Sequence, residues 1–178
     1  MDDGRQRIGD DPFVAPVDQR DPAKRLRGRL AAPVTIWTTY DGSGVPVGVT
    51  ISSVIVVDGD RPSVVAIVQP LSEFWEAVGE SGRFVLHVVD SGAQRVADTF
   101  AGRYPGADSS FPPDTIASEW GPVLGRFPTR AYCTLAGVLL EGQPLVVRGL
   151  IDRLAVDEDA ERPLVHYRGR YFGLRRPD

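Results

Sequence analysis

The sequence has few of the residues that form disulfides or bind metals. Its 178 residues include one cysteine, Cys133, and two histidines, His87 and His166. A single cysteine cannot form an internal disulfide, so we expect a reducing, cytoplasmic location. Without a cluster of His, Cys, Asp and Glu residues, the sequence does not predict a metal site. Because Cys133 lies in an apolar run, we expect it to fill the core.

Long apolar runs and common catalytic motifs are missing as well. No run approaches the roughly 18 apolar residues of a membrane helix, and the first 20 residues lack the apolar core of a signal peptide, so no membrane association is expected. The sequence contains no Gly-x-Ser-x-Gly elbow, no P-loop and no Gly-x-Gly-x-x-Gly after a strand. We therefore expect a bound cofactor to supply any difficult chemistry.

Charge and length restrict the partners and the number of domains that we expect. The 20 Lys and Arg residues against 24 Asp and Glu residues give a net charge of −4, which argues against nucleic acid as a partner. The length suits one hydrophobic core. We expect a poorly ordered N-terminal arm over residues 1–20 and a single domain over residues 21–178.

Apolar and β-branched runs dominate the pattern along this domain. A short basic helix is expected over residues 21–30, and its arginines either form a solvated face or clamp a dinucleotide phosphate. Strands are expected at 34–40, 45–57, 64–68, 84–89, 131–140, 145–156 and 164–174. Helical spacing links Leu71, Phe74, Trp75 and Val78, with Ser72 as N-cap, and a second helix is expected over 93–100. Strands without regular βαβ alternation predict a mainly β, antiparallel barrel with short helical inserts.

Residues 103–130 are rich in Pro and Gly and form a long segment without a clear pattern. Such a segment is too long for an inert connection in a compact domain. We expect a lid or a dimer arm there.

The run Gly48-Val49-Thr50-Ile51-Ser52-Ser53 places small and hydroxyl side chains where a buried strand usually has bulky ones. Gly48 would admit a backbone or a flat ring, and the three hydroxyls suit a phosphate or a ribityl chain. Alternatively, Thr and Ser are simply common in strands. Strict alternation separates Ser53 from Thr50 and Ser52, so all three converge only if the strand bends or ends there.

Five segments in order resemble the flavin reductase-like, FMN-binding split-barrel family. They are Ala32-Pro33-Val34-Thr35, the run from Gly48 to Ser53, Gly82 to Val89, Ala97 to Gly102, and Pro163 to Tyr171. The resemblance covers about residues 24–174. It implies a Greek-key split β-barrel, a homodimer, and FMN or FAD bound near the subunit interface. Members commonly use NADH or NADPH to reduce the flavin, often for a separate monooxygenase component.

The resemblance also implies site residues. Thr50, Ser52 and Ser53, with Gly48 and Val49, match the flavin-contacting strand, and Ser72 falls where a helix often begins near the flavin phosphate. His87 stands where many members have Asn, and it is either a flavin or nicotinamide contact or a packed core residue. The family's Gly-Asp-His turn is replaced here by Glu141-Gly142-Gln143-Pro144.

Three functions remain open on the sequence. The first is an NAD(P)H-dependent flavin reductase in which the protein aligns nicotinamide and flavin for hydride transfer. The second is a flavin-binding electron carrier, store or sensor, which the changed turn suggests. The third is a split-barrel enzyme that uses a deazaflavin or another substrate. An unrelated all-β binding domain is a further alternative.

Overall fold

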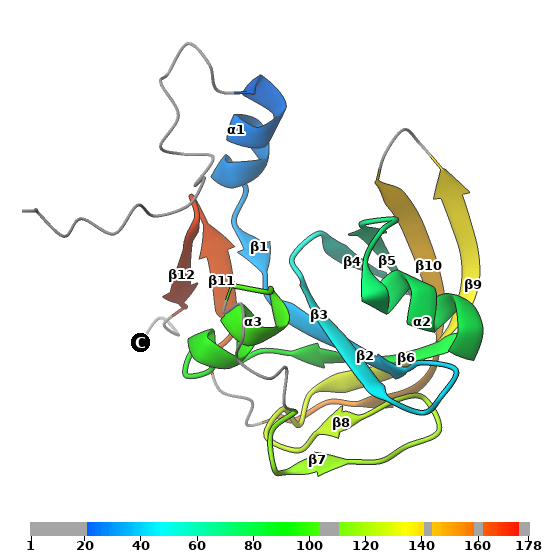
Figure 1. The fold of residues 1–178 in the computed structure, drawn as a ribbon. Helices are drawn as coiled ribbons and strands as arrows, with labels where there is room; N and C mark the ends of the chain where they lie inside the picture. The colour runs from blue at the N-terminus through cyan, green and yellow to red at the C-terminus, as the bar shows by residue number, and fades with distance from the viewer. Residues whose placement is uncertain (1–20, 104–110, 141–143, 159–161, 175–178) are drawn as a thin grey trace, which may run out of the picture.

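Antiparallel strands make up most of the structure, a computed structural model in which residues 21–103, 111–140, 144–158 and 162–174 are described (Figure 1). The expected arm over residues 1–20 and the turn residues Glu141 to Gln143 lie outside these ranges. The three helices of the described ranges are α1 (Pro22–Arg29), α2 (Glu73–Ser81) and α3 (Gln94–Phe100). The strands are β1 (Ala32–Pro33), β2 (Thr35–Tyr40), β3 (Pro46–Ile51), β4 (Val54–Val57), β5 (Ser63–Val68), β6 (Arg83–Val88), β7 (Thr115–Ile116), β8 (Val123–Leu124), β9 (Arg130–Leu140), β10 (Leu145–Ala155), β11 (Leu164–Tyr167) and β12 (Arg170–Gly173).

Seven strands form one curled antiparallel sheet in the order β3-β2-β6-β9-β10-β5-β4. The first and last strands of this order, β3 and β4, are consecutive in the chain and are joined by only Ser52 and Ser53. The Ile67 N–H donates to the Ser53 carbonyl at 3.1 Å, which ties this corner to β5. The sheet therefore curls into a barrel that is closed at one corner and split elsewhere, which confirms the predicted mainly β split barrel.

One core fills the inside of the curled sheet. Trp37 stacks on Phe84 with ring centroids 4.6 Å apart, and Phe74 from α2 packs edge-on against both rings. The Cys133 thiol belongs to this core and is fully buried, as expected. Helix α2 thus contributes an aromatic side chain to the interior of the half-barrel.

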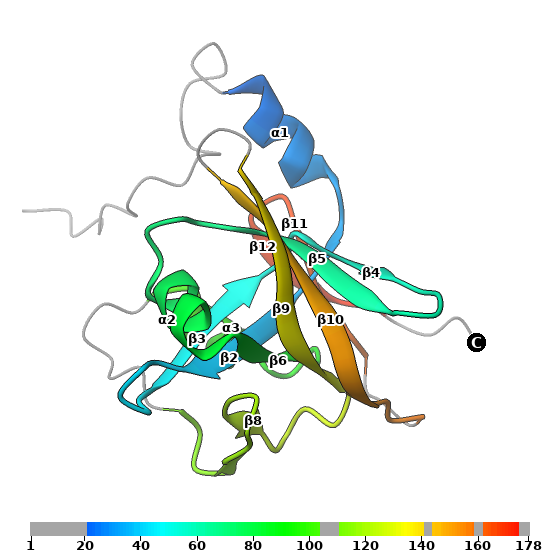
Figure 2. The same ribbon diagram turned by 90° about the vertical axis from the view of Figure 1, so that its right-hand side faces the viewer.

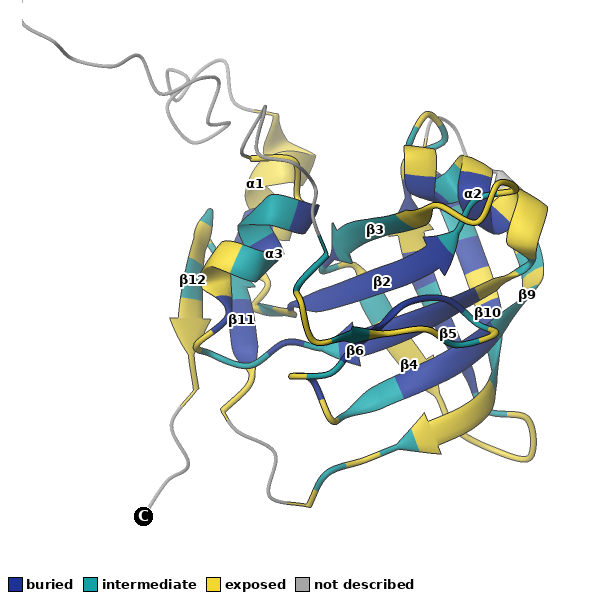
Figure 3. Cartoon of the chain, turned by 60° about the horizontal axis from the view of Figure 1, so that its bottom comes forward, coloured by how far each residue is buried: buried dark blue, intermediate teal, exposed yellow. Residues whose placement is uncertain are grey.

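A second core lies on the other face of β2. It combines Ile36 with Phe100 of α3, Leu124 and Phe127 of the segment after α3, and Leu164 of β11. Because β2 separates the two cores, it is buried along nearly its whole length (Figure 3). The buried Thr38 hydroxyl donates to the Pro122 carbonyl at 2.5 Å, so this buried polar group is satisfied.

Local chemistry fixes the ends of the helices. Asp21 caps α1, where its carboxylate accepts from the Ala23 N–H at 2.8 Å and Pro22 begins the helix. Ser72 caps α2, and Gly82 ends it with a φ of 66°. Leu71 was expected in the apolar stripe of α2, which is wrong: it precedes the helix and is 97% exposed.

Two further expectations need correction. The expected strand over residues 164–174 is a hairpin, because Arg168 and Gly169 form a turn between β11 and β12. The described part of the expected lid, residues 111–129, has Leu124 and Phe127 fully buried in the second core. The stretch from Gly121 to Phe127 is therefore packed against the domain rather than forming a lid.

Candidate functional site

The corner between β3 and β4 exposes two hydroxyl side chains. Ser52 is partly exposed, and its hydroxyl makes no hydrogen bond within the described part of the chain. Ser53 is exposed, and its hydroxyl donates to the Ile67 carbonyl at 3.1 Å. The expected single strand over residues 45–57 ends at Ile51 and resumes at Val54. This break removes the strict alternation that would have placed the two serines on opposite faces.

Ser72 lies at the same end of the sheet, because residues 69–72 directly follow β5 and Ser53 is bonded to β5 there. Its hydroxyl donates to the Gln69 carbonyl at 2.8 Å and accepts from the Trp75 N–H at 3.2 Å. Both bonds belong to the helix cap. The acidic Glu73 stands in the first turn of α2, so this helix end is a weak site for a phosphate.

Gly48 and Thr50 face α3. A Cβ atom at Gly48 would lie 2.6 Å from Cε1 of Phe100, so the close approach that this glycine permits is taken by a ring of the protein itself. The Thr50 hydroxyl donates to the Ala97 carbonyl at 2.7 Å. Both residues therefore hold α3 against β3, while Val49 points to the first core. Of the two, only the Thr50 oxygen retains capacity to accept a bond from a ligand.

His87 is a fully buried residue of β6. Its Nδ1 lies 3.0 Å from the Ile36 carbonyl, and its Nε2 lies 3.1 Å from the Leu124 nitrogen. A carbonyl needs a donor and an N–H needs an acceptor, which fixes a neutral ring with the proton on Nδ1. Burial lowers the pKa of His87 to about 4. The structure thus favours the packed role, since neither nitrogen is available to flavin or nicotinamide.

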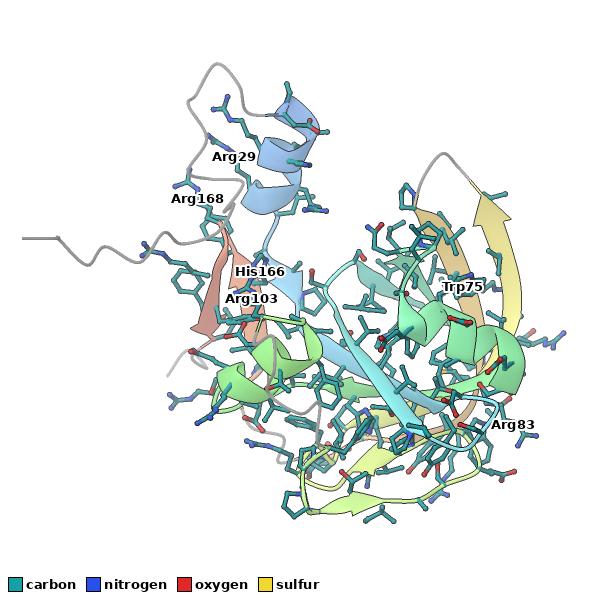
Figure 4. The ribbon with its side chains drawn as sticks, in the orientation of Figure 1. Arg29, Trp75, Arg83, Arg103, His166 and Arg168 are labelled. Carbon is teal, nitrogen blue, oxygen red and sulfur yellow. The ribbon has the colours of Figure 1, made fainter. Side chains whose placement is uncertain are left out.

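His166 of β11 belongs to a charged cluster beside α3 (Figure 4). Its ring meets that of Tyr171 edge-on at 5.6 Å, and the guanidinium of Arg103 lies 5.6 Å from the Tyr171 ring. Arg103 pairs with Asp98 at 3.1 Å. Burial, helped by Arg103 and Arg27, lowers the pKa of His166. No local sequence pattern indicates this cluster, because its members come from three separate segments.

Other kinds of site find no support in the described ranges. No group of three or more His, Cys, Asp or Glu side chains there could hold a metal ion. No helix in those ranges is long and apolar enough to cross a membrane. Burial raises the pKa of the Cys133 thiol to about 12, which makes it a poor nucleophile near neutral pH.

Comparisons with known proteins identify the family. The model of the flavin reductase like domain matches residues 27–175. The reductase subunit HsaB of a flavin-dependent monooxygenase from Mycobacterium tuberculosis is 31% identical, over 90% of this chain and 84% of its own. The NADH-dependent FMN reductase AsuE2 of Streptomyces nodosus subsp. asukaensis is 27% identical, over 86% of this chain and 84% of its own.

A solved structure agrees with these relatives. The crystal structure of a nitrilotriacetate monooxygenase component B homologue from Mycobacterium thermoresistibile is 32% identical and superimposes with a TM-score of 0.79. The match covers 89% of this chain and 88% of that one. Sequence and fold therefore give the same answer over nearly the whole length: the chain belongs to the family of flavin reductase-like domains.

Proposed function

We propose that this protein is a flavin reductase that oxidises NADH or NADPH and reduces FMN or FAD. The observation that carries this proposal is the near full-length similarity to reductases, above all the 31% identity to HsaB across 90% of this chain. The relatives that match include an NADH-dependent FMN reductase. We propose the same donor and acceptor classes here.

The corner between β3 and β4 carries hydroxyl groups that support its assignment as the flavin site. It offers the exposed Ser53 hydroxyl, the acceptor capacity of Thr50 on the α3 side, and the Ser52 hydroxyl, which has no partner among the residues that the structure describes. These are neutral hydrogen-bonding groups suited to a ribityl chain or a ring edge. Three neighbouring residues hold this corner in place. Gly48 packs against α3, Val49 packs in the first core, and Ser72 caps α2.

The chain's own contribution is binding and alignment. A bound flavin supplies the hydride-accepting ring. The protein need not provide a nucleophile, which agrees with a buried Cys133 thiol and a neutral, internally bonded His87. Ser52, Ser53 and Thr50 would fix the position of the flavin, and the rigid barrel behind them would limit its movement.

We propose a monooxygenase component as the protein's partner, because the relatives named HsaB are reductase subunits of flavin-dependent monooxygenases. We also propose a homodimer. The edge strand β4 exposes Ile55, Val56 and Val57 at 62%, 68% and 43%. Figure 2 shows this strand and β5 extending away from the rest of the sheet. An exposed apolar edge strand is a surface that a second copy would cover.

Flavin binding by serine variants tests the proposed site. We expect Ser52→Ala and Ser53→Ala each to weaken FMN binding about 3- to 10-fold, since a neutral hydrogen bond contributes about 0.5–1.5 kcal/mol. Quenching of FMN fluorescence measures the affinity. Ser43→Ala, in the turn between β2 and β3, is the control. If all three variants bind FMN with the affinity of the unchanged protein, the corner is not part of the flavin site.

Anaerobic mixing of NADH with the protein and FMN tests the reaction itself. We expect the visible absorbance of oxidised FMN to fall much faster with protein than without. Tight FMN binding with no faster reduction by NADH or NADPH would instead identify a flavin carrier.

A further inference from the structure

A basic cavity of about 570 Å³ lies between α1 and the β11–β12 hairpin. Among the described residues, no carboxylate lines it, but four arginines and two aromatic rings do: Arg25, Arg29, Tyr167, Arg168, Arg170 and Phe172. Within the described part of the chain, none of the four arginines is paired with a carboxylate. Four guanidinium groups around one hollow attract an anion.

The hairpin turn keeps an arginine where the backbone does not favour one. Arg168 has a φ of 50° and Gly169 a φ of 76°, which is the two-residue turn that prefers Asn-Gly. Arg168 is the only described non-glycine residue with a positive φ. A strained conformation of this kind points to a role for the side chain rather than for the turn.

The cavity walls are joined to each other. The Arg168 N–H donates to the carbonyl of the buried Gly28 at 2.9 Å, which fixes the hairpin against α1. The Arg168 guanidinium lies 5.6 Å from the Tyr167 ring, and that ring meets Phe172 edge-on at 6.2 Å. The site thus has flat apolar surfaces beside its charges, and Figure 4 shows Arg29 and Arg168 near each other at this end of the molecule.

We infer that this cavity binds the phosphate-bearing adenosine half of a dinucleotide. Guanidinium groups bind phosphate in a bidentate way, and aromatic and guanidinium planes stack on an adenine ring. The volume is in the range of small-molecule sites. This inference rests on the proposed function, because NADH, NADPH and FAD all carry an adenosine diphosphate unit.

Calorimetric titration with ADP tests the cavity without any turnover. Arg168→Asn removes one guanidinium and suits the turn, and Arg25→Gln removes another from α1. We expect each to weaken ADP binding at least about tenfold, since a charge-assisted hydrogen bond contributes about 1.5–3 kcal/mol. Arg83→Gln, which lies away from this end of the molecule (Figure 4), is the charge-matched control and should leave ADP affinity unchanged. ADP affinity that is equal in all four proteins would overturn the inference.

Truncated ligands then identify the source of the adenosine. If the nicotinamide donor occupies the cavity, Arg168→Asn raises the KM for NADH but not for reduced nicotinamide mononucleotide. If FAD occupies it, the variant weakens FAD binding but not FMN binding. If Arg168→Asn changes neither the KM for NADH nor the affinity for FAD, the inference is overturned even if ADP binds. Arginine-dependent ADP binding in a protein without reductase activity would count against the proposed function only.

Discussion

At the scale of single residues, the interior holds His87 neutral. Its two ring nitrogens bridge the Ile36 carbonyl and the Leu124 N–H, and burial lowers its pKa to about 4 from 6.5. The unfolded chain therefore binds a proton near pH 6.5 that the folded protein does not bind until about pH 4. Stability is full above the unfolded pKa and falls as the pH drops through this window.

This linkage predicts a pH effect. Between pH 7.5 and 5.5, His87 should remove about 1 kcal/mol from the free energy of unfolding. Urea denaturation at both pH values, in a His166→Gln background, measures it, since the lowered pKa of His166 acts in the same direction. Adding His87→Gln should abolish that part of the pH dependence. The same decrease in both proteins would show that His87 titrates normally in the fold.

Arg168 has a positive φ, a backbone conformation that arginine does not favour. Replacing it with Asn should raise the free energy of unfolding by about 0.5 kcal/mol, because Asn adopts a positive φ at lower cost. Thermal unfolding of Arg168→Asn beside Arg170→Asn, whose position lies in β12 outside the turn, checks this. Destabilisation by Arg168→Asn would mean that the cation–π contact with Tyr167 outweighs the strain.

At the scale of elements, Gly48 allows α3 to pack closely against β3. Gly48→Ala should destabilise the protein by about 1–3 kcal/mol, because the new methyl group would overlap the Phe100 ring. Gly79→Ala in α2 is the matched control: its Cβ would meet no atom within 4 Å, and it should stabilise by about 0.5–1 kcal/mol. Chemical denaturation compares the two. A neutral Gly48→Ala would show that α3 shifts freely.

Local chemistry made many elements predictable. Asp21 and Pro22 begin α1, Ser72 and Gly82 bound α2, and alternating or apolar runs mark the strands. The pairing of β6 with β9 and of β10 with β5 joins distant segments, so no local pattern reveals it. The burial of Leu124 and Phe127 also depends on contacts outside their segment, whose Pro and Gly content suggested a lid instead.

The candidate site was predictable in part, because local sequence signals mark its corner but not the distant residues that pack against it. Ser52 and Ser53 mark the break between β3 and β4, and their small polar side chains signal an exposed corner. Gly48 was read as space for a ligand ring, yet the ring is Phe100, which is 52 residues away in the sequence. The basic cavity was predictable only in part. The sequence shows the arginines of α1, but it does not show that they lie close to Arg168 and Arg170.

At the scale of the whole molecule, the proposed homodimer would cover the exposed strand β4. We expect sedimentation equilibrium to give twice the chain mass of 19.4 kDa, and Val56→Lys to raise the dimer dissociation constant at least about tenfold, because burying an unpaired charge is costly. Val45→Lys, another exposed valine, in the turn before β3, is the control. An unchanged dimer in Val56→Lys would place the interface elsewhere.

Flavin reduction by a nicotinamide donor is the central activity proposed for this protein. The most direct measurement is the steady-state oxidation of NADH and of NADPH by the purified protein while FMN and FAD are titrated in turn. We predict saturable oxidation that requires a flavin, with a clear preference for one donor. No oxidation above the protein-free rate with any of the four pairs would contradict the assignment as a reductase.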